Sequence, residues 1–116
     1  MENVCVEKSF DFAVRIVNLS NYLKDTKKEY TLSKQLLRAG TSIGANVSEA
    51  QRGQSKADFA AKMSIASKEA YETEYWLRLL YRTNYLSEEE FQSIHKDILD
   101  IIRLLMAICK TATTPK

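Results

Sequence analysis

The chain has 116 residues, of which 45% are hydrophobic and 28% are charged, a composition that is normal for one globular domain. Its net charge of +2 gives no support by itself to nucleic-acid binding, and its single proline and three glycines favour an all-α protein. No apolar run approaches the roughly 18 residues that span a bilayer, so we expect no membrane association and a cytoplasmic location.

The first helix is expected over about residues 8–24, after a frayed lead-in over residues 1–7. Apolar residues at helical spacing form two adjacent stripes, one of Phe12, Ile16, Leu19 and Leu23 and one of Phe10, Ala13 and Val17. An apolar arc this wide predicts contacts with more than one neighbour. A charged turn over residues 25–29 follows.

The second helix is predicted over about residues 32–52, and Gly53 is expected to stop it. Three rows run along it: an apolar stripe of Leu32, Leu36, Ala39, Ile43 and Val47, a small row of Gly40, Gly44 and Ser48, and a polar row of Arg38, Ser42, Asn46 and Glu49. A small row lets another backbone approach closely, although each glycine costs the helix roughly 1 kcal/mol relative to alanine. We therefore expect this helix to depend on its neighbours, and we assign the polar row to structure rather than to ligand binding.

The third and longest helix is predicted over about residues 55–85, and Ser55 with Asp58 resembles a capping box at its start. A heptad seam runs along it through Phe59, Met63, Ala66, Ala70, Thr73, Leu77, Leu80 and Asn84. Glutamates lie beside this seam. A buried Arg38 paired with Glu72 or Glu74 would satisfy both groups and fix the register of two helices.

The fourth helix is predicted over about residues 88–110, with Ser87 and Glu90 as its capping box and a polar tail over residues 111–116. It carries two apolar seams, one of Phe91, Ile94, Ile98, Ile101, Leu105 and Ile108 and one of His95, Leu99, Ile102, Met106 and Cys109. One seam is enough for an antiparallel up-and-down four-helix bundle, so two seams indicate a central helix or a subunit interface. With no repeat and no linker, residues 1–116 are interpreted as a single domain.

Catalytic and metal-binding patterns are missing from the sequence. The lone histidine, His95, lies on an apolar seam and is interpreted as structural, and the Glu-x-x-His pairs of di-metal bundles do not occur. Gly40 and Gly44 lie inside a predicted helix and cannot form a phosphate-binding loop. We therefore predict no enzyme activity, no cofactor, no metal and no small-molecule substrate. Cys5 and Cys109 are interpreted as free thiols in a reducing compartment.

Basic residues gather at three places in the sequence. Lys27 and Lys28 lie in the first turn, and Arg52 and Lys56 flank the second loop. The third helix carries an aromatic and basic row, Tyr71, Tyr75, Arg78 and Arg82. Arginines beside tyrosines can bind phosphates and stack on bases. The alternatives are a solvated face or a protein interface rich in tyrosine and arginine.

Two segments of the chain resemble a known family, the bacterial four-helix-bundle proteins encoded within intervening sequences of 23S ribosomal RNA genes. The resemblance rests on residues 35–39 (QLLRA) and 42–50 (SIGANVSEA), and on Phe59 with residues 65–77 (IASKEAYETEYWL). It implies an antiparallel four-helix bundle that assembles into a homopentameric ring without enzymatic activity. Relatives that accompany diversity-generating retroelements act as accessory proteins and bind nucleic acid through a basic ring.

Two hypotheses of function follow. The first is a non-catalytic oligomer that binds structured RNA or a ribonucleoprotein, with phosphate contacts from Lys27, Lys28, Arg52, Lys56, Arg78 and Arg82. The second is a protein–protein adaptor or scaffold with no nucleic-acid role, with Tyr71, Tyr75 and Trp76 in its interface.

Overall fold

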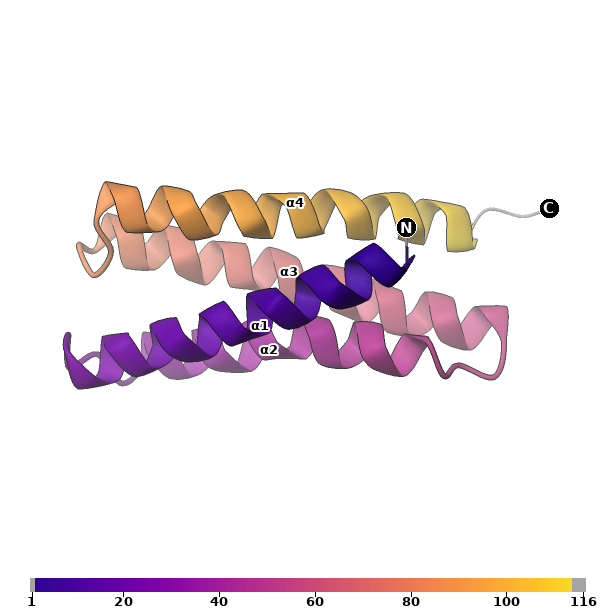
Figure 1. The fold of residues 1–116 in the computed structure, drawn as a ribbon, viewed down its shortest axis with the longest axis horizontal. Helices are drawn as coiled ribbons and strands as arrows, with labels where there is room; N and C mark the ends of the chain where they lie inside the picture. The colour runs from indigo at the N-terminus through magenta and orange to yellow at the C-terminus, as the bar shows by residue number, and fades with distance from the viewer. Residues whose placement is uncertain (1, 114–116) are drawn as a thin grey trace.

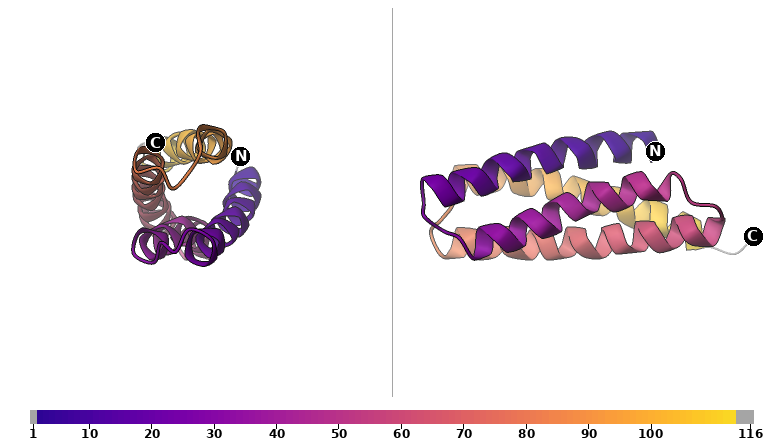
Figure 2. Two further views of the ribbon diagram at one scale, coloured as in Figure 1. Left: turned by 90° about the vertical axis from the view of Figure 1, so that its left-hand side faces the viewer. Right: turned by 90° about the horizontal axis from the view of Figure 1, so that it is seen from below.

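The computed structural model describes residues 2–113, which form four helices and no strands, so the all-α prediction is confirmed. The helices are α1 (Glu2–Asp25), α2 (Leu32–Ala50), α3 (Lys56–Arg82) and α4 (Glu88–Thr113). They lie along one long axis, with the α1–α2 and α3–α4 loops at one end and the α2–α3 loop at the other (Figure 1). Seen from the end, they follow one another around the bundle in chain order (Figure 2).

The core is built from the apolar stripes that the periodicity predicts. On α3 the seam is buried from Met63 to Leu80, whereas Phe59 is half-buried and Asn84 is exposed. On α4 the first seam is buried from Ile94 to Ile108. The largest fully buried side chains of the other two helices are Phe12, Ile16, Leu23, Leu36, Ile43 and Val47. Each helix therefore directs one stripe at a common core.

The contact between α1 and α2 depends on the missing side chains of two glycines. A Cβ atom at Gly40 would lie 2.8 Å from both γ-carbons of Ile16, and one at Gly44 would lie 3.1 Å from the backbone oxygen of Ser9. Both glycines are buried, as is Ser9 on the facing helix, whereas Ser48, the third member of the small row, is exposed. The small row thus brings the two backbones together over its first two members.

The start of α2 is held by a residue that the sequence pattern did not single out. Glu29 is buried, and its carboxylate accepts hydrogen bonds from the backbone N–H groups of Leu32 (3.0 Å) and Ser33 (2.8 Å). The Ser33 hydroxyl donates to the Glu29 carbonyl at 2.7 Å. These bonds satisfy backbone donors that a helix N-terminus leaves without partners, so the charged turn is also a cap.

The predicted caps of α3 and α4 are present. The Ser55 hydroxyl accepts from the Asp58 N–H at 3.0 Å. At α4 the box is reciprocal, because Ser87 Oγ accepts from the Glu90 N–H (3.1 Å) while the Glu90 carboxylate accepts from the Ser87 N–H (2.8 Å). Both caps fix where a long helix begins.

The first and last helices are longer than the sequence predicts. The helix α1 begins at Glu2 rather than near residue 8, because Cys5 and Ser9 are buried and give the first turns a packed face. The helix α4 continues to Thr113, so residues 111–113 of the predicted tail are helical. Met1 and residues 114–116 lie outside the described residues.

The second and third helices end earlier than the sequence predicts. The helix α2 ends at Ala50, and Gly53 is not in the left-handed conformation expected of a helix stop. A Cβ at Gly53 would lie 3.1 Å from the Phe59 backbone nitrogen, so this glycine lets the loop approach the start of α3. The helix α3 ends at Arg82 because Asn84 takes a left-handed backbone, with φ of 70°.

Replacing Gly40 with alanine should lower the free energy of unfolding by about 1 kcal/mol. Overpacking costs about 1–3 kcal/mol, which exceeds the gain of about 1 kcal/mol in helix propensity, and β-branched Ile16 cannot easily move aside. Urea denaturation followed by circular dichroism measures the change. Ser48→Ala is the matched control, because the same row is exposed there and the variant should be as stable as the wild type or more so. A Gly40→Ala variant that gains stability would contradict the close-approach argument.

Cys5 should make stability depend on pH. Both cysteines are free, and burial raises the pKa of the Cys5 thiol from 9.0 to about 11, with nearby Cys109 adding to the rise. The folded chain therefore holds this proton more tightly than the unfolded chain. Its stabilising contribution is complete below about pH 9 and is lost as the pH rises towards about 11. Urea midpoints measured across this range should fall more steeply for the wild type than for Cys5→Ala, and parallel curves would refute the assignment.

Candidate nucleic-acid interface

The outward surface of α3 carries the aromatic and basic row that the sequence predicts. Tyr71, Tyr75, Arg78 and Arg82 are spaced by four, three and four residues, which places them on one face of the helix. All four are exposed, and the two tyrosines are 51% and 50% accessible. We call these four residues the α3 face. It presents two flat rings and two guanidinium groups to solvent.

Glu74 joins the α3 face to α4. Its carboxylate accepts from Arg78 Nε at 3.0 Å and lies 2.8 Å from His95 Nε2. His95 also stacks on Phe91, at 4.6 Å between ring centroids, and Phe91 stacks in turn on Tyr81 at 4.5 Å. The histidine is therefore part of a polar and aromatic contact between two helices, which agrees with its structural interpretation.

Beside this contact, α4 adds cations that the sequence reading did not select. A shallow hollow of about 330 Å³ is lined by Phe91, Gln92, His95, Lys96, Leu99 and Arg103. Lys96 is exposed and forms no ion pair within residues 2–113, while Arg103 pairs with Asp100 at 3.0 Å. Further along α4, Met106 Sδ accepts a hydrogen bond from the Tyr71 hydroxyl at 3.3 Å. The basic surface thus continues from α3 onto α4.

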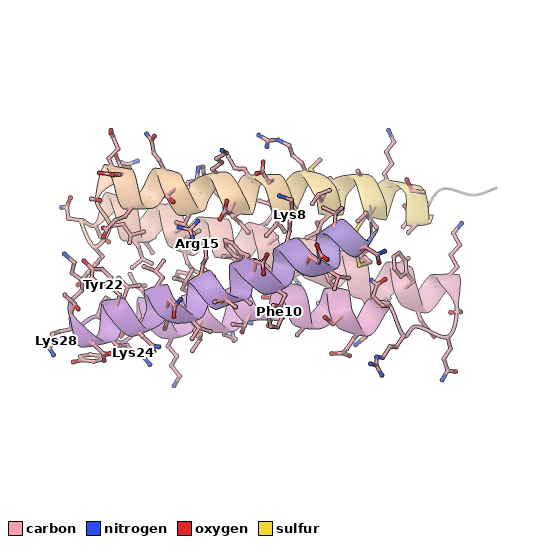
Figure 3. The ribbon with its side chains drawn as sticks, in the orientation of Figure 1. Lys8, Phe10, Arg15, Tyr22, Lys24 and Lys28 are labelled. Carbon is pink, nitrogen blue, oxygen red and sulfur yellow. The ribbon has the colours of Figure 1, made fainter. Side chains whose placement is uncertain are left out.

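The six basic residues predicted as phosphate contacts fall into two groups. Lys27 and Lys28 lie in the α1–α2 loop, at the same end of the bundle as Arg82 at the end of α3 (Figure 1). Figure 3 shows Lys28 at this end, beside Lys24 and Tyr22, and the Lys27 ammonium lies 5.9 Å from the Tyr22 ring centroid.

The second group lies at the opposite end of the molecule. Arg52 and Lys56 flank the α2–α3 loop. At 1.5 Å per residue, Lys56 and Arg82 are separated by about 39 Å along the axis of α3. One compact ligand therefore cannot contact all six predicted residues in a single chain.

The polar row of α2 ties this helix to α3. Arg38 pairs with Glu72 and, at 3.5 Å, with Glu69. The Glu72 carboxylate also accepts the Trp76 indole N–H at 3.2 Å. The predicted Arg38–Glu72 pair is confirmed, whereas Glu74 faces α4, and Arg38 is 52% exposed rather than buried because its guanidinium reaches along the surface.

The other members of the polar row also make structural contacts. Glu49 pairs with Lys62 of α3 at 3.0 Å. The Asn46 side chain donates to the Ser42 carbonyl at 2.8 Å, within its own helix. The row therefore forms ion pairs with α3 at both of its ends.

Within residues 2–113, no three histidine, cysteine or acidic side chains are grouped in a way that could hold a metal ion. None of the four helices combines the length and apolar character needed to cross a membrane.

Comparison with known proteins identifies a family and a solved structure that this chain is similar to. The family model described as 23S rRNA-intervening sequence protein matches residues 1–107. A crystal structure of a protein of unknown function from the S23 ribosomal protein family of Bacteroides thetaiotaomicron VPI-5482 is 55% identical in sequence. The match covers 94% of this chain and 97% of that one, with a TM-score of 0.92. No curated protein matches the chain.

Replacing Arg38 with methionine should lower the free energy of unfolding by about 1 kcal/mol, because it removes the cation beside two partly exposed carboxylates. Chemical denaturation measures the loss. Lys34→Met on the same helix removes an exposed charge and should change stability by less than about 0.5 kcal/mol. Adding Glu72→Gln to Arg38→Met should recover part of the loss, because glutamine still accepts the Trp76 bond. If Arg38→Met is as stable as the wild type, Arg38 does not fix the register of α2 and α3.

Proposed function

This chain belongs to the 23S rRNA-intervening sequence protein family, and from that premise we propose that it is a non-catalytic, oligomeric helical bundle that binds structured RNA. The family model names no enzymatic activity, and the related crystal structure is described as a protein of unknown function. The proposal therefore rests on the surface chemistry of this chain.

The α3 face carries the proposal. Exposed arginines contact phosphates, while exposed tyrosines stack on bases that are unpaired in loops and bulges. Lys96 and Arg103 extend the basic surface onto α4, and Lys27 and Lys28 lie at the end where α3 finishes. Such contacts recognise the shape and charge of RNA rather than its sequence.

We assign unequal roles to the six predicted contact residues. Arg78, Arg82, Lys27 and Lys28 belong to the proposed RNA surface, because the C-terminal part of α3 and the α1–α2 loop lie at the same end of the bundle. Arg52 and Lys56 lie at the far end and are assigned no contact with the same RNA segment. This division makes the proposal testable within one chain.

The proposed assembly is an antiparallel up-and-down bundle repeated in a ring, with five subunits as the family resemblance implies. Support comes from α1, where Phe10, Val14 and Val17 are exposed at 66%, 47% and 41%. An apolar surface of this kind is typical of a contact with another protein. A ring also repeats each basic surface around one axis, which strengthens the electric field that a weakly charged single chain produces.

The exposed apolar residues of α1 also favour a second candidate function, that of an adaptor for another protein. In that function the tyrosines of the α3 face contact protein rather than RNA. Trp76 contributes less than the sequence suggests, because it is half-buried and its indole N–H already binds Glu72.

Binding of structured ribosomal RNA, measured against salt concentration, tests the proposal. The logarithm of the affinity should fall linearly with the logarithm of the salt concentration, because phosphate contacts release counterions. Arg78→Gln with Arg82→Gln should reduce the slope by about 1.4–1.8, since each lost phosphate contact removes about 0.7–0.9.

The matched control is Arg52→Gln with Lys56→Gln, which removes the same charge from the opposite end. It should leave the slope close to that of the wild type. Equal effects of the two double variants would contradict the assigned surface. If the wild type binds no RNA even at low salt, the RNA function is wrong and the adaptor function takes its place.

A further inference from the structure

The single histidine of the chain lies inside the candidate nucleic-acid interface. Histidine is the side chain that ordinarily gains or loses its charge between about pH 5 and 8. A change of charge on this surface near neutral pH is therefore centred on one ring, that of His95. The ring joins two helices, and in the same position it can also set the charge of the surface around it.

The contact with Glu74 fixes which nitrogen of the neutral His95 ring carries the proton. Nε2 lies 2.8 Å from Glu74 Oε2, and the same oxygen lies 2.9 Å from Arg78 Nε. An ionised carboxylate can only accept hydrogen bonds, so Nε2 is the nitrogen that donates. The other nitrogen, Nδ1, is then a bare acceptor in the neutral ring, and it becomes an N–H donor when the ring is protonated.

Nδ1 is open to solvent at the hollow on α4. It makes no hydrogen bond within residues 2–113, and no buried side-chain nitrogen in that range lacks a partner, so Nδ1 is not buried. The His95 side chain is 24% exposed and lines the hollow of about 330 Å³ beside Lys96 and Arg103. A ligand in this hollow meets a lone pair at high pH and a proton at low pH.

The charged groups around the histidine ring come from two helices. From α3, Glu74 contacts the ring directly and Arg78 contacts Glu74. From α4, Lys96 and Arg103 line the hollow, and Arg103 pairs with Asp100. These groups carry an excess of one positive charge while the ring is neutral, and protonation of the ring doubles that excess. The hollow attracts an anion more strongly once the ring is protonated.

We infer that the hollow on α4 receives a phosphate of the bound RNA, and that protonation of His95 turns Nδ1 into a donor for this phosphate. The inference rests on the proposed function and adds to it a contact and a dependence on pH. Phosphate oxygens accept hydrogen bonds, so the lone pair of the neutral Nδ1 repels them and the N–H of the charged ring binds them. Glu74 keeps its bond to Nε2 in both states, so the ring changes charge without changing place.

The hollow is also in the right place for this role. Arg78 of the α3 face and His95 of the hollow bind the same carboxylate oxygen of Glu74, so the two surfaces adjoin at that atom. An RNA strand whose phosphates contact the α3 face can therefore continue into the hollow. Lys96 supplies the charge that is present at every pH near neutrality, because it is exposed and forms no ion pair within residues 2–113.

RNA affinity at two pH values tests the inference, with the full chain and the structured ribosomal RNA of the salt experiment. Between about pH 8 and about pH 5.5, the range in which histidine titrates, the affinity of the wild type should rise about three- to fivefold, as for one exposed charge pair. The salt slope should steepen by about 0.7–0.9, because one more phosphate is neutralised. His95→Gln keeps a donor for Glu74 but cannot titrate, so its affinity should not rise.

Two lysine variants locate the contact. Lys96→Gln should shrink the rise in affinity, because groups that hold the same phosphate do not act additively. Lys56→Gln removes the same charge at the far end of α3 and should leave the rise unchanged. Circular dichroism checks that every variant folds. A rise that both lysine variants reduce equally overturns the assignment to the hollow.

Nuclear magnetic resonance of the His95 ring gives a test that needs no variant. If protonation favours RNA binding, RNA binding must favour protonation, so the midpoint of the ring titration should move to higher pH when RNA is bound. An unchanged midpoint, or a folded His95→Gln whose affinity rises as much as that of the wild type, overturns the inference while RNA binding stands. A wild type that binds no RNA at either pH overturns the proposed function and the inference together.

Discussion

The close approach of α1 to α2 is the constraint on which the rest of the bundle depends. At Gly40 and Gly44 the facing helix occupies the space where side chains would stand, so α1 packs more closely against α2 than against α4. The helix α1 then runs obliquely across the molecule (Figure 1), and this placement leaves open a groove between α1 and the start of α4, lined in part by Leu19, Leu86 and Ile94. The absence of side chains at Gly40 and Gly44 thus determines how closely α1 packs on α2 and how open the surface is between α1 and α4.

Much of this fold can be predicted from local signals. The apolar seams of α3 and α4 recur at helical spacing over many turns, and the pair of Ser87 and Glu90 marks a helix start by itself. The helix ends that were predicted wrongly are set by tertiary contacts and by backbone conformation, which apolar spacing does not reveal. The first turns of α1 are stable because Cys5 and Ser9 are packed against the rest of the bundle, and α3 stops where Asn84 turns left-handed, a conformation that asparagine adopts more readily than most residues.

The candidate site is only partly visible in the sequence, for a similar reason. The α3 face lies on one helix, so its four residues can be grouped by spacing alone. Lys96 joins that surface only because Glu74 and His95 set α4 beside α3, which no local pattern reveals. Sequence reading also joined Arg52 and Lys56 to the other cations, although the predicted length of the third helix already places them far from Arg78 and Arg82. Glu29 looked like one charge in a charged turn, and only the fold shows it capping α2.

The side chain of Trp76 lies between the Arg38–Glu72 ion pair and the exposed Tyr75 of the α3 face. Its indole N–H binds the carboxylate that also pairs with Arg38, and its ring meets the exposed Tyr75 edge-on at 5.1 Å between centroids. It is the single tryptophan of the chain. Its fluorescence is therefore an intrinsic optical reporter, sensitive to the ion pair between α2 and α3 on one side and to whatever covers Tyr75 on the other, without any attached label.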